Sequence, residues 1–305
     1  MEDLPTDFFV TTSAYTANLY RSQYAAIDPS QPSLSQAGKV VIITGASSGI
    51  GARGLAPAFA QAGPRAMVLV GRNINRLHAT EAALRRINPR VEYISASTDI
   101  TDQAAVTNLF TFVRNRYGHA DVLVNNAGVM SRPRECLVAA VIDPAAWWAD
   151  FEVNVKGTFL MTNAFLSLLP PDVQPRPTVI TLTASVASSL YPGWSSYSIS
   201  KLAAWRIADY VATECPHVTS VALQPGLVLT DTVLDTFKRF ALDKPDLVGG
   251  TAVWLATEAA SFLTGRCISA NWSVDDLMRR RDQILASNDL KLVYHGNFGL
   301  RQFQV

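Results

Sequence analysis

A run of β-branched residues that passes directly into three glycines constrains the fold of this chain more than any other feature. Residues 40–44 read Val-Val-Ile-Ile-Thr, and Gly45, Gly49 and Gly51 follow. The apolar run predicts a strand buried on both faces, and the glycines predict a tight turn into a helix that begins near Ile50. The N–H groups and dipole of such a helix would stabilise a pyrophosphate. The spacing differs from G-x-G-x-x-G, so an ordinary strand-turn-helix is the alternative.

Strand and helix patterns alternate along the following chain. We predict strands at 40–44, 67–70, 91–95, 122–125, 178–182, 218–223 and 267–270, and helices at 50–62, 74–87, 102–117, about 145–169, 196–213 and 246–257. This alternation predicts an α/β fold, a doubly wound, Rossmann-like parallel sheet with right-handed crossovers covering both faces. A ligand is expected at the carboxyl ends of the strands, beside the glycine turn.

Composition limits the classes of partner. With 305 residues, 49% of them apolar, the chain can bury a sizeable core, and a net charge of +1 leaves no long-range field to attract nucleic acid. No stretch approaches twenty apolar residues, so no membrane span is expected. Cys136, Cys215 and Cys267 show no metal spacing, and the acidic start lacks an apolar signal segment. We therefore expect a cytoplasmic protein that binds small molecules, without a metal.

The end of the second strand indicates which dinucleotide the fold prefers. NAD-binding folds commonly place an acid there to bond the ribose 2′-hydroxyl, but this chain has Gly71 followed by Arg72. Arg72 can pair with a 2′-phosphate, which favours NADP(H), unless it is simply an exposed arginine. Arg53 is a weaker candidate for the same contact and is more simply read as a solvated side chain.

Two other strand ends carry polar residues. Asp99, followed by Ile100, is placed either to meet an adenine amino group or to cap the helix that starts near Asp102. Asn125-Asn126-Ala127-Gly128 ends strand four, where it either flanks the cofactor or forms a plain turn.

Tyr197 and Lys201 lie four residues apart and therefore share one face of a helix. That helix follows strand five, whose end carries Ser185, so these side chains are expected at the same sheet edge. A free tyrosine has a pKa of about 10, and a lysine cation nearby would lower it toward the working range of a general acid.

The glycine turn, Asn-Asn-Ala-Gly, Asn154, Ser185, Tyr197 and Lys201 together resemble the short-chain dehydrogenase/reductase family, from about Lys39 to Asn271. The resemblance implies that Tyr197 donates a proton to a carbonyl oxygen and that Ser185 orients the carbonyl. Lys201 would bind the nicotinamide ribose and depress the tyrosine pKa, and Asn154 would hold a relay water. Pro225-Gly226 and Thr230 resemble the segment that contacts the carboxamide. Ala184 and a shorter interval between Ser185 and Tyr197 depart from the pattern.

The expected binding residues follow from these motifs and from the resemblance. Substrate would contact Ser185, Trp194 and Phe237. The cofactor-binding set is Thr44, Gly45, Ser47, Ser48, Gly49, Ile50, Gly51, Arg72, Asp99, Ile100, Asn126, Ala127, Gly128, Tyr197, Lys201, Pro225, Gly226, Val228 and Thr230.

We divide the chain into three parts. Residues 1–37 are an arm lying on the domain or on a second subunit, in which Tyr15, Leu19, Tyr20 and Tyr24 could share one helix face. Residues 38–272 are the dinucleotide-binding catalytic domain, and 273–305 a helical extension. A lid is expected at about 228–250, where Leu234, Phe237, Phe240 and Leu242 indicate a hydrophobic substrate. An amphipathic helix packed on the body is the alternative.

These features predict an NADPH-dependent oxidoreductase that reduces a carbonyl of an apolar small molecule, such as a polyketide-like metabolite, or oxidises the matching alcohol. The arm and the long ending are similar to reductases of fungal secondary metabolism. One alternative is an isomerase, dehydratase or rearrangement enzyme with no net redox. Another is an NADP(H)-binding sensor or scaffold, which would usually lack Tyr197 or Lys201. The resemblance implies a homodimer or homotetramer.

Overall fold

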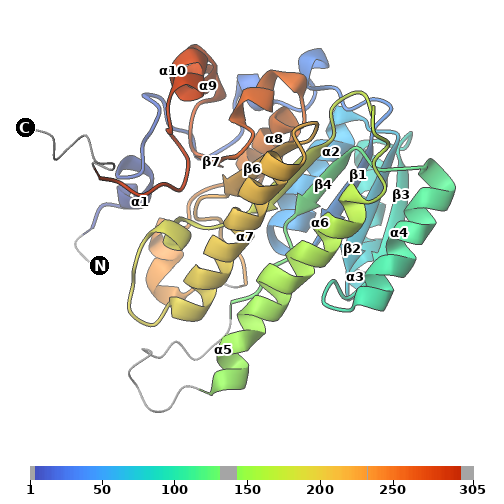
Figure 1. Cartoon of the computed structure of the whole chain (residues 1–305), viewed down its shortest axis with the longest axis horizontal. Coiled ribbons are helices and arrows are strands. Elements are labelled where there is room, and N and C mark those ends of the chain that lie inside the picture. Colours follow the sequence, from blue (N-terminus) through green and yellow to red (C-terminus); the bar gives the residue numbers. More distant parts are fainter. Residues whose placement is uncertain (1–3, 131–142, 232, 297–305) are drawn as a thin grey trace, which may run out of the picture.

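A parallel sheet of seven strands forms the centre of the computed structural model, which describes residues 4–130, 143–231 and 233–296 (Figure 1). The strands lie in the order β3-β2-β1-β4-β5-β6-β7. Their bounds are β1 Val40–Thr44, β2 Ala66–Gly71, β3 Glu92–Ser97, β4 Val122–Asn125, β5 Thr178–Leu182, β6 Thr219–Gln224 and β7 Arg266–Ser269. The predicted α/β fold is confirmed. The strand order changes direction beside β1, so the carboxyl ends of β1 and β4 lie at the point where such folds bind ligands.

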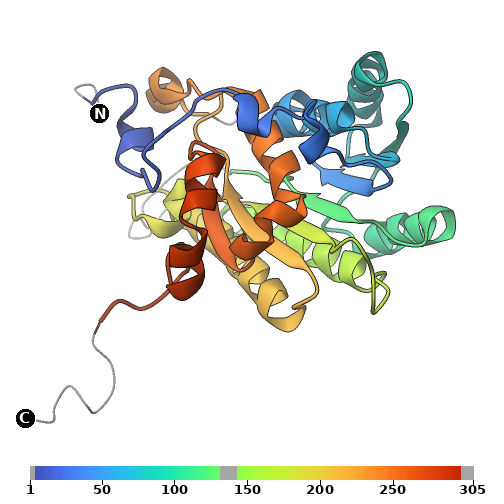
Figure 2. The same ribbon diagram turned by 90° about the horizontal axis from the view of Figure 1, so that it is seen from above.

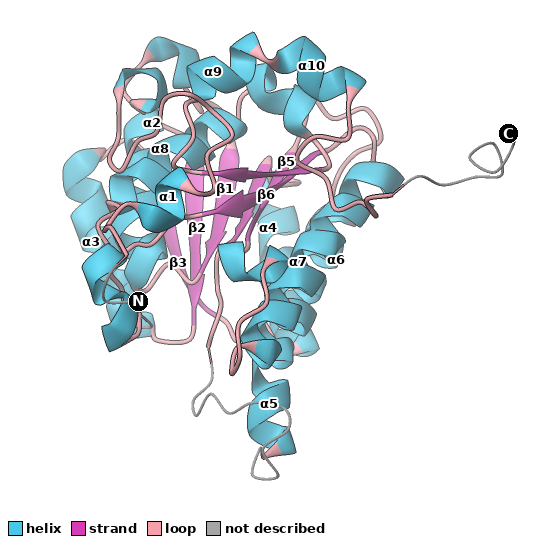
Figure 3. Cartoon of the chain, turned by 90° about the vertical axis from the view of Figure 1, so that its left-hand side faces the viewer, coloured by secondary structure: helices cyan, strands magenta, loops and turns pink. Residues whose placement is uncertain are grey.

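Helices cover both faces of the sheet (Figure 3). One face carries the π-helical turn η3 (Gly51–Leu55), α2 (Ala56–Ala62), α3 (Ile74–Ile87), α8 (Pro245–Leu255), η7 (Glu258–Leu263), α9 (Val274–Arg279) and α10 (Arg281–Ala286). The other face carries α4 (Gln103–Tyr117), α6 (Thr158–Leu166) and α7 (Ser195–Glu214). The π-helical turn η4 (Glu152–Gly157) joins α5 (Pro144–Phe151) to α6. In the described part of the chain, no helix combines the length and apolarity needed to cross a membrane.

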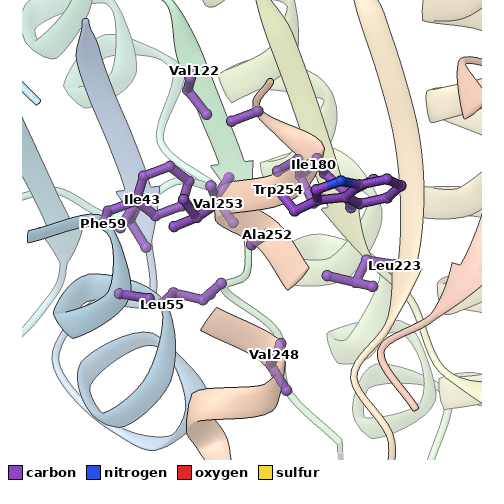
Figure 4. Close-up of a cluster of buried hydrophobic side chains, with 14 of the residues drawn as sticks. Ile43, Leu55, Phe59, Val122, Ile180, Leu223, Val248, Ala252, Val253 and Trp254 are labelled. Atoms are coloured by element: carbon purple, nitrogen blue, oxygen red, sulfur yellow. The ribbon is translucent and has the colours of Figure 1, made fainter. Parts of the chain in front are cut away.

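The central strand β1 is apolar throughout because each of its faces meets a different layer of helices. Val41 and Ile43 belong to the core that includes α2 and α8, part of which Figure 4 shows. Val40 and Ile42 belong to the core beneath α4 and α6. All five residues of β1 are buried. The continuous apolar run is thus explained by burial on both sides, as expected for a central parallel strand.

Most predicted elements exist, with ends that differ by one or two residues from the prediction. The helix predicted over about 145–169 is a continuous run of α5, η4 and α6 that ends at Leu166. Five 3₁₀ turns of the described residues lie outside the predicted set: η1 (Ala25–Ile27), η2 (Pro32–Leu34), η5 (Ser185–Ser188), η6 (Asp235–Phe240) and η7. Cys215 and Cys267 are free thiols, whereas Cys136 lies outside the described residues.

The short helix that would align Tyr15, Leu19, Tyr20 and Tyr24 is wrong. Over its described residues, 4–37, the arm contains only one turn of α-helix, α1 (Phe8–Thr11), and residues 12–24 are not helical. Leu19 instead pairs with Trp272 in an antiparallel bridge, and the rings of Tyr20 and Tyr24 stack with centroids 3.6 Å apart. The aromatic residues are explained by packing of an irregular segment against the core, since Tyr15, Leu19, Tyr20 and Tyr24 all contact it.

Two glycines allow the helix after the glycine turn to approach α8 closely. A Cβ atom on Gly249 would lie 2.2 Å from the carbonyl oxygen of Gly54 and 2.7 Å from the Cβ of Ala58. A Cβ atom on Gly54 would lie 2.2 Å from the carbonyl oxygen of Pro245. This close packing holds η3, which directly follows the glycine turn, against α8.

We expect Gly249→Ala to lower the free energy of unfolding by about 1–3 kcal/mol, because the added methyl group forces two packed backbones apart. Gly71→Ala is the control, since its new Cβ would meet only side-chain atoms, at 3.3 Å and beyond. Urea unfolding monitored by circular dichroism measures both variants. Equal stabilities would contradict the importance of the close contact.

Candidate active site

A cleft of about 210 Å³ opens at the carboxyl ends of β1, β4 and β5. It brings together residues from the glycine turn, the end of β4, helix α7 and the segment after β6. The lining residues are Gly45, Ser48, Gly49, Ile50, Asn126, Ala127, Gly128, Val129, Met130, Leu182, Thr183, Tyr197, Lys201, Pro225, Thr230 and Asp231. Thr183 lies at the end of strand five, which the sequence placed at this edge. Sequence reasoning missed Val129, Met130, Leu182 and Asp231, which are neighbours of the motif residues in the chain.

Hydrogen bonds between Thr44 and Asn126 hold the two central strand ends together. The Thr44 hydroxyl accepts hydrogen bonds from the backbone N–H groups of Asn126 and Ala127, each 2.9 Å long. The Asn126 amide donates to the carbonyl oxygen of Thr44 at 2.7 Å. Gly45 has a φ of +68°, and a Cβ there would lie 2.8 Å from the Asn126 amide nitrogen. Only glycine fits this turn without displacing Asn126.

The ammonium of Lys201 lines the cleft, whereas the buried amide of Asn154 lies behind two lining residues, Gly128 and Val129. Asn154 Oδ1 accepts from the Val129 N–H at 2.9 Å, and its Nδ2 donates to the Ser200 hydroxyl at 3.0 Å. Lys201 Nζ donates to the carbonyl oxygen of Leu182 at 3.1 Å. A Cβ on Gly128 would lie 2.9 Å from Lys201 Nζ and 3.1 Å from Asn154 Oδ1. The glycine therefore keeps this side of the cleft open.

Lys201 is a cation in a buried position. Burial lowers the pKa of its ammonium group to about 8, and the negative charge of Asp150 on α5 partly opposes this change. Asp150 is itself buried, and it accepts a hydrogen bond of 2.9 Å from the Ser196 hydroxyl. Sequence reasoning missed Asp150, because no local pattern shows that α5 packs against α7.

Tyr197 and Lys201 share one face of α7, as the four-residue spacing predicts. Lys201 Nζ lies 6.0 Å from the centroid of the Tyr197 ring, and both residues line the cleft. Ser185 begins η5 and is exposed, and the Ser198 hydroxyl donates to the carbonyl oxygen of Val186, which ties η5 to α7. Ser185, Trp194 and Phe237 are not among the lining residues of the cleft.

A second hollow, of about 650 Å³, adjoins the cleft at Ser48. It is lined by Ser47, Ser48, Arg72, Asn73, Ile74 and Arg76. Asn73 caps α3 by accepting a hydrogen bond from the Arg76 N–H, at 3.0 Å. Arg76 was missed, although its position four residues after Arg72 places both guanidinium groups within reach of one site. The hollow carries two cations beside the glycine turn.

Asp99 does not cap helix α4, which corrects one of its two predicted roles. Asp102 caps the helix, and the Asp99 carboxylate accepts hydrogen bonds from the N–H and hydroxyl of Thr101, at 2.9 and 2.8 Å. The Thr101 N–H is the main reason that the pKa of Asp99 lies below its usual value, and the charge of Arg72 adds to it. Ile100, which follows, packs against Gly157 of η4.

The segment after β6 closes the far side of the cleft. Gly226 has a φ of +73°, and a Cβ there would lie 2.4 Å from Asp243 Oδ2. Thr230 lies across from the glycine turn, with its methyl group 3.7 Å from the position of a Cβ on Gly49. Arg53 is not merely a solvated side chain, because it donates to the carbonyl oxygen of Leu229 at 2.6 Å. This bond ties the helix of the glycine turn to the opposite wall of the cleft. Val228, which precedes Leu229 in the chain, is buried.

These residues fit a dinucleotide. Gly49 and Gly128 line the cleft without side chains that would narrow it, while the basic hollow extends the cleft beyond Ser48. The cleft itself carries the phenol of Tyr197 and the ammonium of Lys201. An arrangement of this kind can hold phosphates at one end and present a proton donor at the other.

Comparison with known proteins identifies the family. The family model for short chain dehydrogenases matches residues 39–239. The short chain dehydrogenase citE of Monascus ruber is 37% identical over 267 residues, which cover 84% of this chain and 89% of that protein. A structure described as a short-chain alcohol dehydrogenase from Sinorhizobium meliloti superposes with a TM-score of 0.68 at 26% identity, over 79% of this chain and 97% of that one. A short chain dehydrogenase from Shigella flexneri, complexed with NADP, has the same TM-score at 22% identity, over 79% and 99%.

The chain therefore belongs to the short-chain dehydrogenase/reductase family, whose enzymes bind NAD(H) or NADP(H).

The buried charge of Lys201 predicts a pH-dependent contribution to stability. Below about pH 8 the ammonium is protonated in both the folded and the unfolded chain, so the folded state carries the full cost of burying a cation. Between its folded pKa of about 8 and the ordinary value of 10.5, the unfolded chain binds more protons, so stability rises with pH. Relative to Lys201→Met, the free energy of unfolding of the cofactor-free protein should rise by about 3 kcal/mol across this window.

Urea unfolding at several pH values between about 7.5 and about 10.5 measures this difference. Lys156→Met is the control, since Lys156 is an exposed lysine paired with Glu152. A difference between wild type and Lys201→Met that stays constant with pH would contradict the depressed pKa.

Proposed function

We propose that this short-chain dehydrogenase is an NADPH-dependent reductase that converts a carbonyl of an apolar small molecule to an alcohol, or catalyses the reverse oxidation. The observation that carries the proposal is the pairing of Tyr197 with the buried Lys201 in the cleft that the glycine turn borders. A scaffold without turnover would not need a buried cation beside a phenol, because burying the charge costs stability.

The residues of the chain supply the proton and the orientation. When bound, NADPH would supply a hydride to the carbonyl carbon. Tyr197 donates its phenolic proton to the carbonyl oxygen, so that one C–H bond and one O–H bond form as the C=O double bond becomes single. The cationic charge of Lys201 stabilises the phenolate that remains. Ser185 orients the carbonyl oxygen, and Asn154 holds the water that returns a proton toward Tyr197.

A preference for NADPH over NADH is supported by the basic hollow. Arg72 and Arg76 line it, and none of its six lining residues is acidic. A 2′-phosphate in this hollow would form charge-assisted hydrogen bonds that a 2′-hydroxyl does not offer. Asp99, at the end of β3, is the residue that we assign to the adenine amino group.

An apolar substrate is supported by the aromatic side chains next to Tyr197. The Trp194 ring lies 6.2 Å from the Tyr197 ring, and the Phe237 ring lies 5.5 Å from Trp194, centroid to centroid. Similarity to dehydrogenases of Monascus and Aspergillus supports a substrate from fungal secondary metabolism, such as a polyketide-like ketone. A cytoplasmic homodimer or homotetramer completes the proposal.

Tyr197→Phe should lower kcat for NADPH-dependent ketone reduction by about 10²- to 10⁴-fold, because the ring keeps its shape but loses the donated proton. The dissociation constant of NADPH should stay within about twofold. Disappearance of the reduced-nicotinamide absorbance measures turnover, and the change in NADPH fluorescence measures binding. Tyr210→Phe on the same helix is the control, since that ring is 59% exposed. A fully active Tyr197→Phe variant would exclude Tyr197 as the proton donor.

Arg72→Ala should raise the dissociation constant of NADPH by about tenfold to a hundredfold, the effect of losing one charge-assisted phosphate contact. NADH binding should change little, because it lacks the 2′-phosphate. Fluorescence titrations with both nucleotides measure the two constants, and Arg86→Ala, which removes an exposed guanidinium elsewhere on α3, is the control. Equal weakening of NADPH and NADH would show that Arg72 does not contact the 2′-phosphate.

A further inference from the structure

The N-terminal arm, residues 4–37, is held against the body of the protein by specific hydrogen bonds. The Tyr20 N–H donates to the carbonyl oxygen of Asn271 at 2.8 Å, and the Asn271 amide donates to the carbonyl oxygen of Tyr20 at 2.9 Å. The Asn18 N–H donates to Asp276 Oδ2 at 2.8 Å. Asn271 also borders the Pro225–Gly226 turn, because a Cβ on Gly226 would lie 2.7 Å from its Oδ1. The arm therefore packs directly behind the cofactor-side loop, residues 225–231.

One ion pair connects the arm both to the cofactor-side loop and to the segment that follows it. Arg21 Nε donates to Asp243 Oδ1 at 2.7 Å, and the Asp243 side chain has no exposed surface. Asp243 Oδ2 accepts from the Leu227 N–H at 2.6 Å, which fixes the cofactor-side loop. Arg21 Nη2 also donates to the carbonyl oxygen of Phe240 at 2.9 Å. Without Arg21, Asp243 would be a buried carboxylate that has lost its cationic partner.

Near its N-terminal end, the arm carries an aromatic residue, Phe9, that contacts the lid segment, residues 233–243. The ring of Phe9 in α1 lies 5.7 Å from Phe237 and 5.0 Å, edge to face, from Phe240. Phe237 contacts Trp194, which in turn contacts Tyr197. Figures 1 and 2 both show α1, in blue, beside the orange helix η6 that carries Phe237 and Phe240. A continuous row of rings therefore runs from the phenol of Tyr197 to the arm.

These contacts distinguish the lid segment from a helix that packs only on the domain core. Phe240 is fully buried, whereas Phe237 is partly exposed and Leu242 is 46% exposed. The apolar side chains of the segment therefore have different surroundings: Phe240 contacts the arm, Phe237 contacts both the arm and Trp194, and Leu242 faces solvent. Offset and edge-to-face ring pairs at these distances are favourable for aromatic side chains and for aromatic ligands alike.

We propose that the N-terminal arm completes the substrate site. Phe9 is a specificity-determining residue that packs behind Phe237, which in turn contacts Trp194, so that this wall accepts a flat aromatic substituent of the substrate. Arg21 is a positioning residue that acts through Asp243 on both the lid segment and the cofactor-side loop. The inference rests on the proposed reduction of an apolar carbonyl compound, but its ligand-binding half is testable without turnover.

The test compares Phe9→Ala with Phe8→Ala in the full chain, using 2-acetylnaphthalene as the aromatic ketone and butanone as the small one. Phe9→Ala should weaken the binding of 2-acetylnaphthalene, measured by calorimetry with and without NADPH, by about tenfold, the loss of one buried ring contact. It should raise KM for this ketone by the same factor, with kcat and the KM for butanone unchanged. Phe8→Ala is the control and should have little effect. Among the described residues, the Phe8 ring pairs with no aromatic ring other than Phe9.

Arg21→Met should produce the same selective loss, together with at least about tenfold faster hydrogen exchange at the Leu227 N–H, because that donor loses its fixed acceptor. Arg21→Lys, which keeps a cation that can donate to Asp243, should restore most of the affinity, and Arg86→Met should resemble wild type.

The outcomes separate this inference from the proposed function. Binding of 2-acetylnaphthalene without turnover in wild type would contradict the proposed reduction of this ketone, and the dissociation constants of Phe9→Ala and Phe8→Ala would still decide the role of the arm. Unchanged affinity in Phe9→Ala, or no binding to wild type, would overturn the inference. A third outcome would also overturn the inference. If both variants lost affinity equally for both ketones, and their melting temperatures fell equally, the arm would act only on stability.

Discussion

The close approach of two backbones at the carboxyl ends of β1 and β4 is the constraint on which the rest of the site depends. Asn126 donates two hydrogen bonds to Thr44 across this gap, and a side chain on Gly45 would collide with Asn126. Because the strands and the helices that follow them diverge from this point, a cleft opens between the glycine turn and α7. Thus a steric requirement of a few atoms sets both the position of the cleft and the identity of the residues that border it.

The cations of the site lie in two different environments: Lys201 is buried, whereas Arg72 and Arg76 are exposed to solvent. Lys201 is buried against the Leu182 carbonyl, and this burial lowers the pKa of its ammonium group. Arg72 and Arg76 are exposed around an open hollow, so they remain hydrated until an anion displaces water. A buried charge costs stability but keeps its geometry, whereas an exposed pair is suited to recognising a ligand that arrives from solvent.

The arm extends this arrangement beyond the sheet. The sheet and its helices position Tyr197 and Lys201, but the loop and lid on the other side of the cleft lack regular strands to hold them. Asp243 supplies part of that support, since its carboxylate joins the Leu227 N–H to Arg21 of the arm. A segment more than two hundred residues away from Asp243 in sequence thereby contributes to the shape of the wall beside the phenol of Tyr197.

The sequence by itself determined the α/β fold, the parallel strands, the glycine turn and the pairing of Tyr197 with Lys201, because each depends on residues that are close together in the chain. Apolar runs, glycines and a four-residue spacing act locally, so they can be interpreted without a structure. Only the tertiary structure decided that Arg76 joins Arg72, that Asp150 approaches Lys201, and that Arg21 and Phe9 reach the lid segment. The predicted helix at Tyr15–Tyr24 was wrong for the same reason: contacts with Trp272 and the core outweigh a weak local periodicity, and such contacts between distant segments leave no local pattern in the sequence.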